Sequence, residues 1–153
     1  MAGLRRTASV TWFGPAREGR GTFRVGSGAL VAPFTYNSRF KGNNETNPEE
    51  LLLAAQAGCL TMALAAALSE KEAEPATIET SAELDLVPHA ESGGYRIPSM
   101  ELNMAVYNTP LGQSELDAVL RHAIEMCPIC HALTGTDIKV TVRAALRSSQ
   151  PAD

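Results

Sequence analysis

Three cysteines are the residues of this chain whose type and spacing could do chemistry. Cys127 and Cys130 belong to the string Cys-Pro-Ile-Cys-His, whereas Cys59 stands alone in a stretch rich in alanine and leucine. Three cysteines are too few, and odd in number, for the disulfide framework of a small secreted protein. In a reducing cytosol, cysteines that matter usually do so through thiol reactivity or metal binding, and these three residues could do either.

The string at 127–131 fits several kinds of site. It matches a c-type haem attachment literally, but that chemistry needs export, and no secretory signal is visible. It also matches a thioredoxin-like motif, except that a helix rather than the strand of a βαβ unit is expected before it. As half a zinc site it lacks a second cysteine pair, and His89 and His122 have no ligand-like spacing. The remaining interpretation is that Cys127 precedes a helical turn started by proline, whose backbone N–H groups could favour its thiolate.

Cys59 is expected in the middle of a helix, where a free cysteine is most often a small core residue. A thiol there lies beyond the reach of the helix dipole, so lowering its pKa requires a positive side chain nearby. Arg39, ahead of the helix, is the nearest candidate in sequence. At about 100° per residue, Glu49 lies about 80° around the helix from Cys59, whereas Glu50 faces the other side. Glu49 could therefore hold a cation over the thiol.

The helix that carries Cys59 is predicted over about residues 48–68. Asn47 is a good N-cap, Pro48 suits the first helical position, and Pro75 bars continuation. The run is apolar nearly all round, which predicts burial on most sides. A membrane span of about 18 residues is the competing interpretation, but no flanking basic anchor supports it. We therefore expect a core helix and no association with a membrane.

Most of the other periodic segments predict strands. Residues 7–13 and 21–25 are short β-branched and aromatic runs that indicate a hairpin, and residues 29–36 can add a further strand. Apolar and polar residues alternate over 77–87 and again over 95–107, with a glycine-containing turn between them. These two stretches predict a second antiparallel hairpin.

The C-terminal part is expected to contain two helical segments and a last strand. Residues 113–126 predict an amphipathic helix capped by Ser114, and residues 128–134 a short helical turn that ends at Gly135. The last strand is predicted over 137–146. The apolar stripe of the amphipathic helix consists of Leu116, Val119, Leu120 and Ala123.

The element order and composition indicate one α+β domain with antiparallel sheets over residues 1–153, with a disordered tail from about residue 148. The hydrophobic share of 44% and the charged share of 20% are ordinary for a globular protein. Lys and Arg number 13 against 17 Asp and Glu, without a basic cluster, which disfavours binding to nucleic acid or anionic membranes. With no secretory signal visible, the cytosol is the default compartment.

The motifs around the cysteines resemble those of the OsmC/Ohr family (osmotically inducible protein C and organic hydroperoxide resistance protein). Residues 46–51 (TNPEEL) and 54–64 (AAQAGCLTMAL) match the first motif, and residues 127–129 (CPI) match the second. The spacing between the two cysteines matches as well. The arginine of residues 37–40 (NSRF) is more like the OsmC branch than the Ohr branch, and the resemblance covers about residues 7–147.

This resemblance implies an intertwined homodimer, in which antiparallel sheets wrap around central helices and the active sites use both chains. It implies reduction of organic hydroperoxides, and of hydrogen peroxide to a degree that depends on the branch, without metal, haem or another cofactor. By position, Cys59 is the peroxidatic thiol and Cys127 the resolving thiol. Arg39 would stabilise the thiolate and the leaving alkoxide, and Glu49 would orient Arg39. An external dithiol must then reduce the Cys59–Cys127 disulfide.

Two alternatives stay open at this point. The family position of Cys130 is commonly not cysteine, so Cys130 is either a small buried residue or a thiol that competes as resolver or pairs with Cys127. The chain could also be a non-catalytic binding or stress-interaction protein that keeps the fold. An ordinary thiol pKa of about 8.5 for Cys59 would favour that second function.

Overall fold

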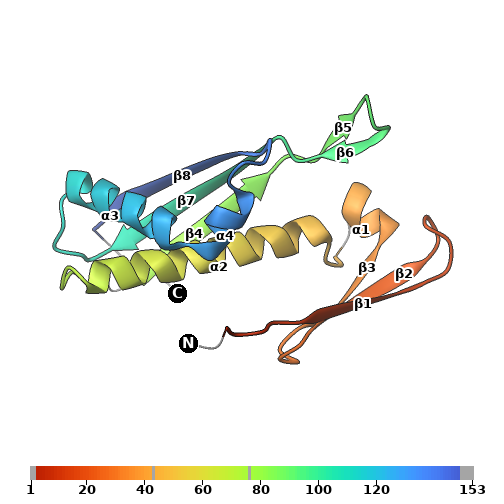
Figure 1. Cartoon of the computed structure of the whole chain (residues 1–153), viewed down its shortest axis with the longest axis horizontal. Helices are drawn as coiled ribbons and strands as arrows, with labels where there is room; N and C mark the ends of the chain where they lie inside the picture. Colours follow the sequence, from red (N-terminus) through yellow and green to blue (C-terminus); the bar gives the residue numbers. More distant parts are fainter. Residues whose placement is uncertain (1–2, 43, 76, 149–153) are drawn as a thin grey trace. The chain divides into compact units, whose positions relative to one another are not determined.

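The computed structural model describes residues 3–42, 44–75 and 77–148, and these form two compact units that meet in the sequence at Leu52 and Leu53. Both units contain strands, and the predicted α+β class is confirmed (Figure 1). The expected single domain stays a prediction. Residues 149–153 of the expected disordered tail lie outside the described residues.

A three-stranded antiparallel sheet forms most of the first unit. It consists of β1 (Ala8–Phe13), β2 (Arg20–Val25) and β3 (Val31–Thr35), in that order. The predicted hairpin is therefore confirmed, and the third strand is shorter than predicted because a helix starts at Tyr36. The rings of Phe23 and Phe34 stack at 4.1 Å between centroids, so aromatic side chains of neighbouring strands hold this small sheet together.

The short helix α1 (Tyr36–Phe40) follows β3 and carries Arg39. Thr35 and Ser38 form a capping box, in which the Ser38 N–H donates to Thr35 Oγ1 and the Thr35 N–H donates to Ser38 Oγ. Ser38 is buried, although the residues around it are mostly polar. The T-x-x-S spacing was the available signal for this helix, which the sequence patterns above did not predict.

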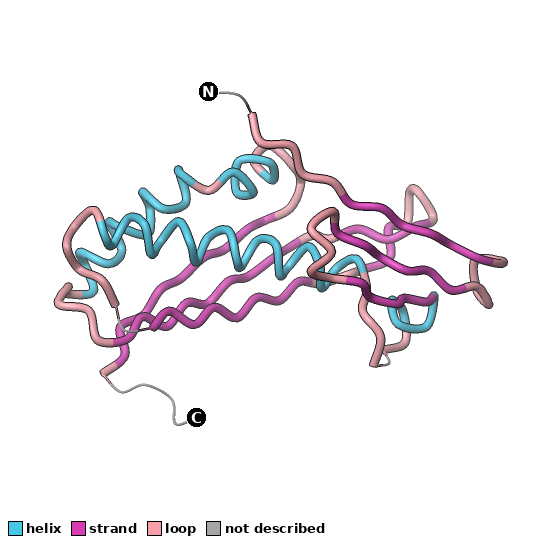
Figure 2. Tube along the Cα trace, turned by 90° about the horizontal axis from the view of Figure 1, so that it is seen from below, coloured by secondary structure: helices cyan, strands magenta, loops and turns pink. Residues whose placement is uncertain are grey.

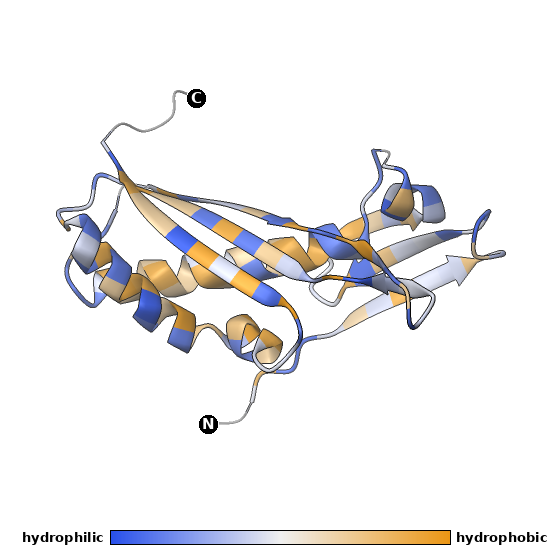
Figure 3. Ribbon diagram, turned by 90° about the horizontal axis from the view of Figure 1, so that it is seen from above, coloured by the Kyte–Doolittle hydropathy of each residue, from blue (hydrophilic) through white to orange (hydrophobic). Residues whose placement is uncertain are grey.

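Helix α2 (Pro48–Ser69) begins as predicted, because Asn47 Oδ1 accepts the Glu50 N–H at 2.8 Å. Its expected burial on most sides is wrong for a single chain: Met62 has 75% of its surface exposed. Most of α2 is apolar (Figure 3), and it has the length and composition of a membrane span, as core helices of soluble proteins also can. One chain covers only one side of this helix. Its buried residues are Glu49, Gln56, Leu60, Leu64, Ala67 and Leu68.

The second unit is built on the sheet β4 (Thr77–Leu84), β7 (Ser99–Tyr107) and β8 (Lys139–Arg147), in the order β4-β7-β8. β4 and β7 pair antiparallel, as predicted. The two long strands expected on either side of the turn are interrupted, because β5 (Val87–His89) and β6 (Gly94–Arg96) form a separate two-stranded hairpin.

The pairing of β8 differs from the expected antiparallel arrangement. β8 runs parallel to β7, because α3 (Gln113–Met126) and α4 (Pro128–Leu133) form a crossover connection between them. The sheet is therefore mixed, and the Cys-Pro-Ile-Cys string lies in the crossover between α3 and the end of α4, preceded by a helix rather than a strand as expected.

The ends of α3 and α4 correct one prediction and confirm another. α3 starts at Gln113 with Gly112 as N-cap, so the expected cap at Ser114 is wrong. The Gly112 N–H instead donates to a carboxylate oxygen of Glu115 at 2.8 Å, which stabilises the helix start without a capping side chain. After α4, Gly135 has a φ of 81°, a conformation that glycine adopts readily and that ends the helical segment as predicted.

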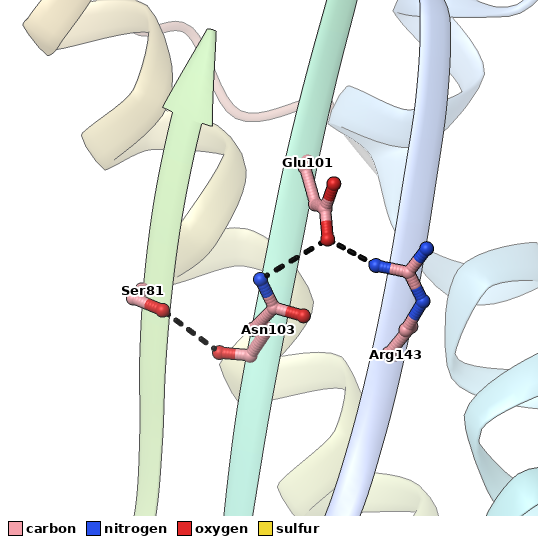
Figure 4. Close-up of polar contacts among 4 residues, drawn as sticks. All are labelled: Ser81, Glu101, Asn103 and Arg143. Carbon is pink, nitrogen blue, oxygen red and sulfur yellow. Dashed lines mark hydrogen bonds and ion pairs between the residues drawn. The ribbon is translucent and has the colours of Figure 1, made fainter.

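Apolar side chains from one face of the sheet and from α2 and α3 form the core of the second unit. α2 runs along the strands (Figure 2), and the predicted stripe of α3 is buried. Alternate residues of β7 point into this core, namely Met100, Leu102, Met104 and Val106. The other face of the sheet is polar: Arg143 pairs with Glu101, Asn103 donates to Glu101, and Ser81 donates to the Asn103 carbonyl (Figure 4).

Candidate active site

The fold brings Cys59 of α2 and Cys127, the N-cap of α4, together within the second unit, although 68 residues separate them in sequence. Their sulfur atoms are 2.9 Å apart, and both are free thiols. Cys127 is fully buried and Cys59 is half-buried. A disulfide bond is about 2.05 Å long, so the two sulfurs need to approach by only about 0.9 Å to form one. This pair can therefore undergo thiol–disulfide chemistry with little change of structure.

Backbone N–H groups at the start of α4 face both sulfurs. Cys127 is the N-cap of α4, and its sulfur accepts the Cys130 N–H at 3.4 Å. The sequence predicted this relation between Cys127 and the proline-started turn. The backbone of Ile129 also forms a hydrogen bond with Cys59, a contact that the sequence did not indicate because the two residues are so far apart in the chain.

The surroundings of Cys59 in the second unit disfavour its thiolate. Burial raises the pKa of Cys59, and the hydrogen bond with Cys127 and the charge of that neighbour raise it further. The Ile129 N–H acts in the opposite direction, but the pKa of Cys59 stays above its ordinary value. A thiol that attacks peroxide must be deprotonated, so these neighbours alone do not activate Cys59 and a cation is still required.

Such a cation is present in the first unit, where Arg39 pairs with Glu49. Arg39 Nε donates to Glu49 Oε1 at 2.8 Å, and Arg39 Nη2 forms an ion pair with the same oxygen at 2.7 Å. Glu49 is buried, whereas the Arg39 side chain remains 40% exposed. α1 presents Arg39, and the first turn of α2 presents Glu49. The contact between Arg39 and Glu49 is as expected, while the meeting of Arg39 with Cys59 stays a prediction.

A third thiol and a buried amide adjoin the cysteine pair. Gln56 Nε2 lies 3.0 Å from the Cys130 sulfur and donates to it. Gln56 is fully buried, and its Oε1 has no partner among the described residues. The sequence signal for Gln56 was a polar residue three positions before Cys59 in an otherwise apolar helix. Over the described ranges, no group of three or more His, Cys, Asp or Glu side chains could hold a metal ion.

The family model described as OsmC-like protein matches residues 41–143. Peroxiredoxin OsmC of Escherichia coli K12 is 33% identical over 131 residues, which cover 85% of this chain and 90% of that protein. Organic hydroperoxide resistance protein OhrA of Bacillus subtilis is 30% identical over 141 residues, covering 91% and 95%. The crystal structure of OhrB from the same organism has a TM-score of 0.71 at 26% identity, covering 91% and 98%. With matches that span most of its length and include both cysteine motifs, the chain belongs to the OsmC-like family.

Proposed function

We propose that this protein is a cysteine-based peroxidase that reduces organic hydroperoxides, with Cys59 as the attacking thiol. The observation that carries this proposal is the 2.9 Å separation of the Cys59 and Cys127 sulfurs. A thiol that is oxidised by peroxide needs a second thiol within reach to become a disulfide. The names of the relatives, a peroxiredoxin and organic hydroperoxide resistance proteins, support the same chemistry.

The reaction has three steps. The Cys59 thiolate attacks one peroxide oxygen, the O–O bond breaks, and the alkoxide leaves and takes up a proton while Cys59 becomes a sulfenic acid. The Cys127 thiol then attacks the Cys59 sulfur, so that a disulfide forms and water leaves. An external dithiol reduces this disulfide and is itself oxidised. The chain needs no metal or haem in any of these steps.

Arg39 supplies the positive charge that the reaction requires, and Glu49 holds its guanidinium in place. Arg39 would stabilise the Cys59 thiolate against the effects of burial and of Cys127, and would then meet the charge of the departing alkoxide. Glu49 holds two guanidinium nitrogens through one oxygen and so fixes the direction of the remaining N–H groups. A buried carboxylate with this contact suits a positioning residue, since Arg39 loses less freedom when substrate binds.

A homodimer with active sites at its interface is part of this proposal. The apolar residues of α2 that one chain leaves exposed, such as Met62, would be covered by a second copy. The first unit also exposes large apolar side chains on its strands, including Val10, Phe13 and Val31. Sedimentation of the protein should show a dimer, and Met62→Asp should dissociate it. A monomeric wild-type protein would contradict this part of the proposal.

The cytoplasm is the proposed location, because recycling of the disulfide requires a reducing compartment that supplies dithiols.

The proposed activity is tested by the consumption of tert-butyl hydroperoxide in the presence of dithiothreitol. Cys59→Ser should abolish turnover. Cys127→Ser should permit one oxidation of Cys59, which dimedone traps as a sulfenic acid, and no Cys59–Cys127 disulfide should form. The same assay with hydrogen peroxide measures how strongly the site prefers an organic peroxide. Undiminished turnover of Cys59→Ser would overturn the proposal.

A second candidate is a non-catalytic binding or stress-interaction protein with the same fold. The raised pKa of Cys59 favours it, because a protonated thiol does not attack peroxide. Alkylation of Cys59 as a function of pH distinguishes the two. A midpoint above the ordinary thiol value in the intact protein, together with no peroxide consumption, would establish the non-catalytic function.

A further inference from the structure

Three thiols, rather than two, converge at the start of α4. The Cys127 sulfur lies 2.9 Å from the Cys59 sulfur and accepts the backbone N–H of Cys130 at 3.4 Å. Cys127 is the N-cap of α4 and Cys130 is its third residue. Residues three apart on a helix have Cα atoms about 5 Å apart, within the roughly 4.4–6.8 Å that a disulfide spans. Cys127 can therefore bond to Cys59 or to Cys130 without rearrangement of the helix.

Gln56 donates a hydrogen bond to Cys130 that a cysteine acting only as a small packing residue would not need. Its amide is fully buried in the core, donates to the Cys130 sulfur at 3.0 Å, and leaves its own carbonyl oxygen without a partner among the described residues. A buried polar group without a partner destabilises the fold, so an apolar residue would serve packing better. An N–H directed at a sulfur stabilises the negative charge that the sulfur carries when it attacks a disulfide.

The surroundings of the three sulfurs differ in access. Cys127 is fully buried, whereas Cys59 and Cys130 are both half-buried, and Cys130 also lines a cavity of about 270 Å³. The cavity is open to solvent, and most of the side chains that line it are apolar, among them Ile124, Leu133, Ile138, Val140 and Val142. An external dithiol can therefore reach Cys130 more readily than the buried Cys127.

We infer that Cys130 is a third redox-active thiol, which takes the disulfide over from Cys59 and presents it to the external reductant. This inference rests on the proposed peroxidase function and extends it. The Cys130 thiol loses its proton to solvent and attacks the Cys127 sulfur of the Cys59–Cys127 disulfide. The Cys127–Cys130 bond forms, the Cys59–Cys127 bond breaks, and Cys59 leaves as a thiolate that can regain the proton. The exchange needs no additional oxidant or reductant, and it returns Cys59 to its reactive form.

The number of peroxide equivalents consumed without a reductant tests the exchange. Fully reduced wild-type protein with two equivalents of tert-butyl hydroperoxide should consume both, giving a Cys127–Cys130 disulfide and a Cys59 sulfenic acid that dimedone labels. Cys130→Ser should stop after one equivalent, with a Cys59–Cys127 disulfide and no label on Cys59. The difference in consumption is therefore twofold, and mass spectrometry of peptides locates each bond.

The outcomes separate this inference from the proposed function. Wild-type protein that consumes one equivalent and retains a Cys59–Cys127 disulfide, with Cys130 free to be alkylated, would overturn the role of Cys130 alone. No consumption of the first equivalent would overturn the peroxidase itself.

Gln56→Met is the second variant, because it keeps the length of the side chain and removes its N–H. It should still form the first disulfide while slowing the transfer to Cys130 several-fold. A transfer rate equal to that of the wild type would show that Gln56 has no positioning role.

Discussion

The two units of the chain hold different halves of the proposed chemistry. The first unit has a charged pair, Arg39 and Glu49, which are ten residues apart and joined by a hydrogen bond of 2.8 Å and an ion pair of 2.7 Å. The second unit has thiols, of which Cys59 and Cys127 are 68 residues apart and meet only through the tertiary fold. The charged pair is partly exposed, whereas the thiols are largely buried. Burial of Cys59 and its contact with Cys127 disfavour ionisation of Cys59.

The proximity of the two thiols and the activation of Cys59 are therefore separate requirements. The second unit places two sulfurs close enough for a disulfide, but burial and the neighbouring sulfur raise the pKa of Cys59. Arg39, the guanidinium proposed to reverse this effect, belongs to the first unit. An exposed arginine would be mobile in water, and its buried partner Glu49 restricts it. Variants that weaken one half without touching the other can show whether the two halves act together.

The largest effect is expected for Arg39→Gln, which removes the charge and keeps hydrogen-bonding ability. Loss of a group that stabilises developing negative charge typically costs about 10²–10³-fold in rate, and we expect kcat/KM for tert-butyl hydroperoxide to fall by that factor. Stopped-flow measurement of the first oxidation gives the value directly.

Arg39→Lys is the matched control for Arg39→Gln, because it retains the charge and loses the planar fork. It should recover part of the rate. Peroxide kinetics of Arg39→Gln equal to those of the wild type would mean that the charged pair of the first unit does not act on Cys59.

The parts of the site that could be predicted from the sequence are those encoded by local patterns. The N-cap at Asn47 and helix phasing identified Glu49 rather than Glu50 as the partner of Arg39, and the structure contains that contact. Both helix termini and side-chain phase follow from residues close in sequence. The capping box of α1 is also a local pattern. The helix was nevertheless missed, because five residues are too few to show a helical periodicity of apolar residues.

The remaining features depended on contacts that no local pattern contains. The parallel pairing of β8 with β7 results from the crossover through α3 and α4, and strand alternation alone does not distinguish parallel from antiparallel partners. The Gln56–Cys130 contact joins residues 74 apart. The burial of α2 was overestimated, because apolar composition shows that a face will be covered but not whether the same chain covers it.

A smaller effect is expected for Glu49→Gln, which keeps the shape of the side chain and loses its charge. Hydrogen bonds to charged groups contribute about 1.5–3 kcal/mol, so weakening those to Arg39 should lower kcat/KM about tenfold. The same kinetic assay measures it. Arg39 keeps its own charge in this variant, which is why the loss should be smaller than for Arg39→Gln.

Glu50→Gln is the matched control for Glu49→Gln, since Glu50 is the next residue of α2 and is exposed. Substitutions at exposed positions usually change free energies by no more than about 0.5 kcal/mol, so its rate should stay within about twofold of the wild type. Equal losses in the two variants would indicate a general effect of negative charge near the start of α2 rather than positioning of Arg39.

The smallest effect is expected for Cys127→Ala and concerns the pKa of Cys59. Burial is the main cause of the raised pKa of Cys59, and the contact with Cys127 adds to it, so removing Cys127 should lower this pKa while the larger effect of burial stays. The alkylation rate of Cys59 against pH should therefore shift its midpoint to lower pH, with faster alkylation at neutral pH. An unchanged midpoint would mean that Cys127 has no influence on the ionisation of Cys59.

The double variant Cys127→Ala, Arg39→Gln tests whether the charge of the first unit acts on Cys59. Its alkylation midpoint is compared with that of Cys127→Ala alone. A much higher midpoint in the double variant would show that the charge of Arg39 outweighs the effect of burial on the pKa of Cys59.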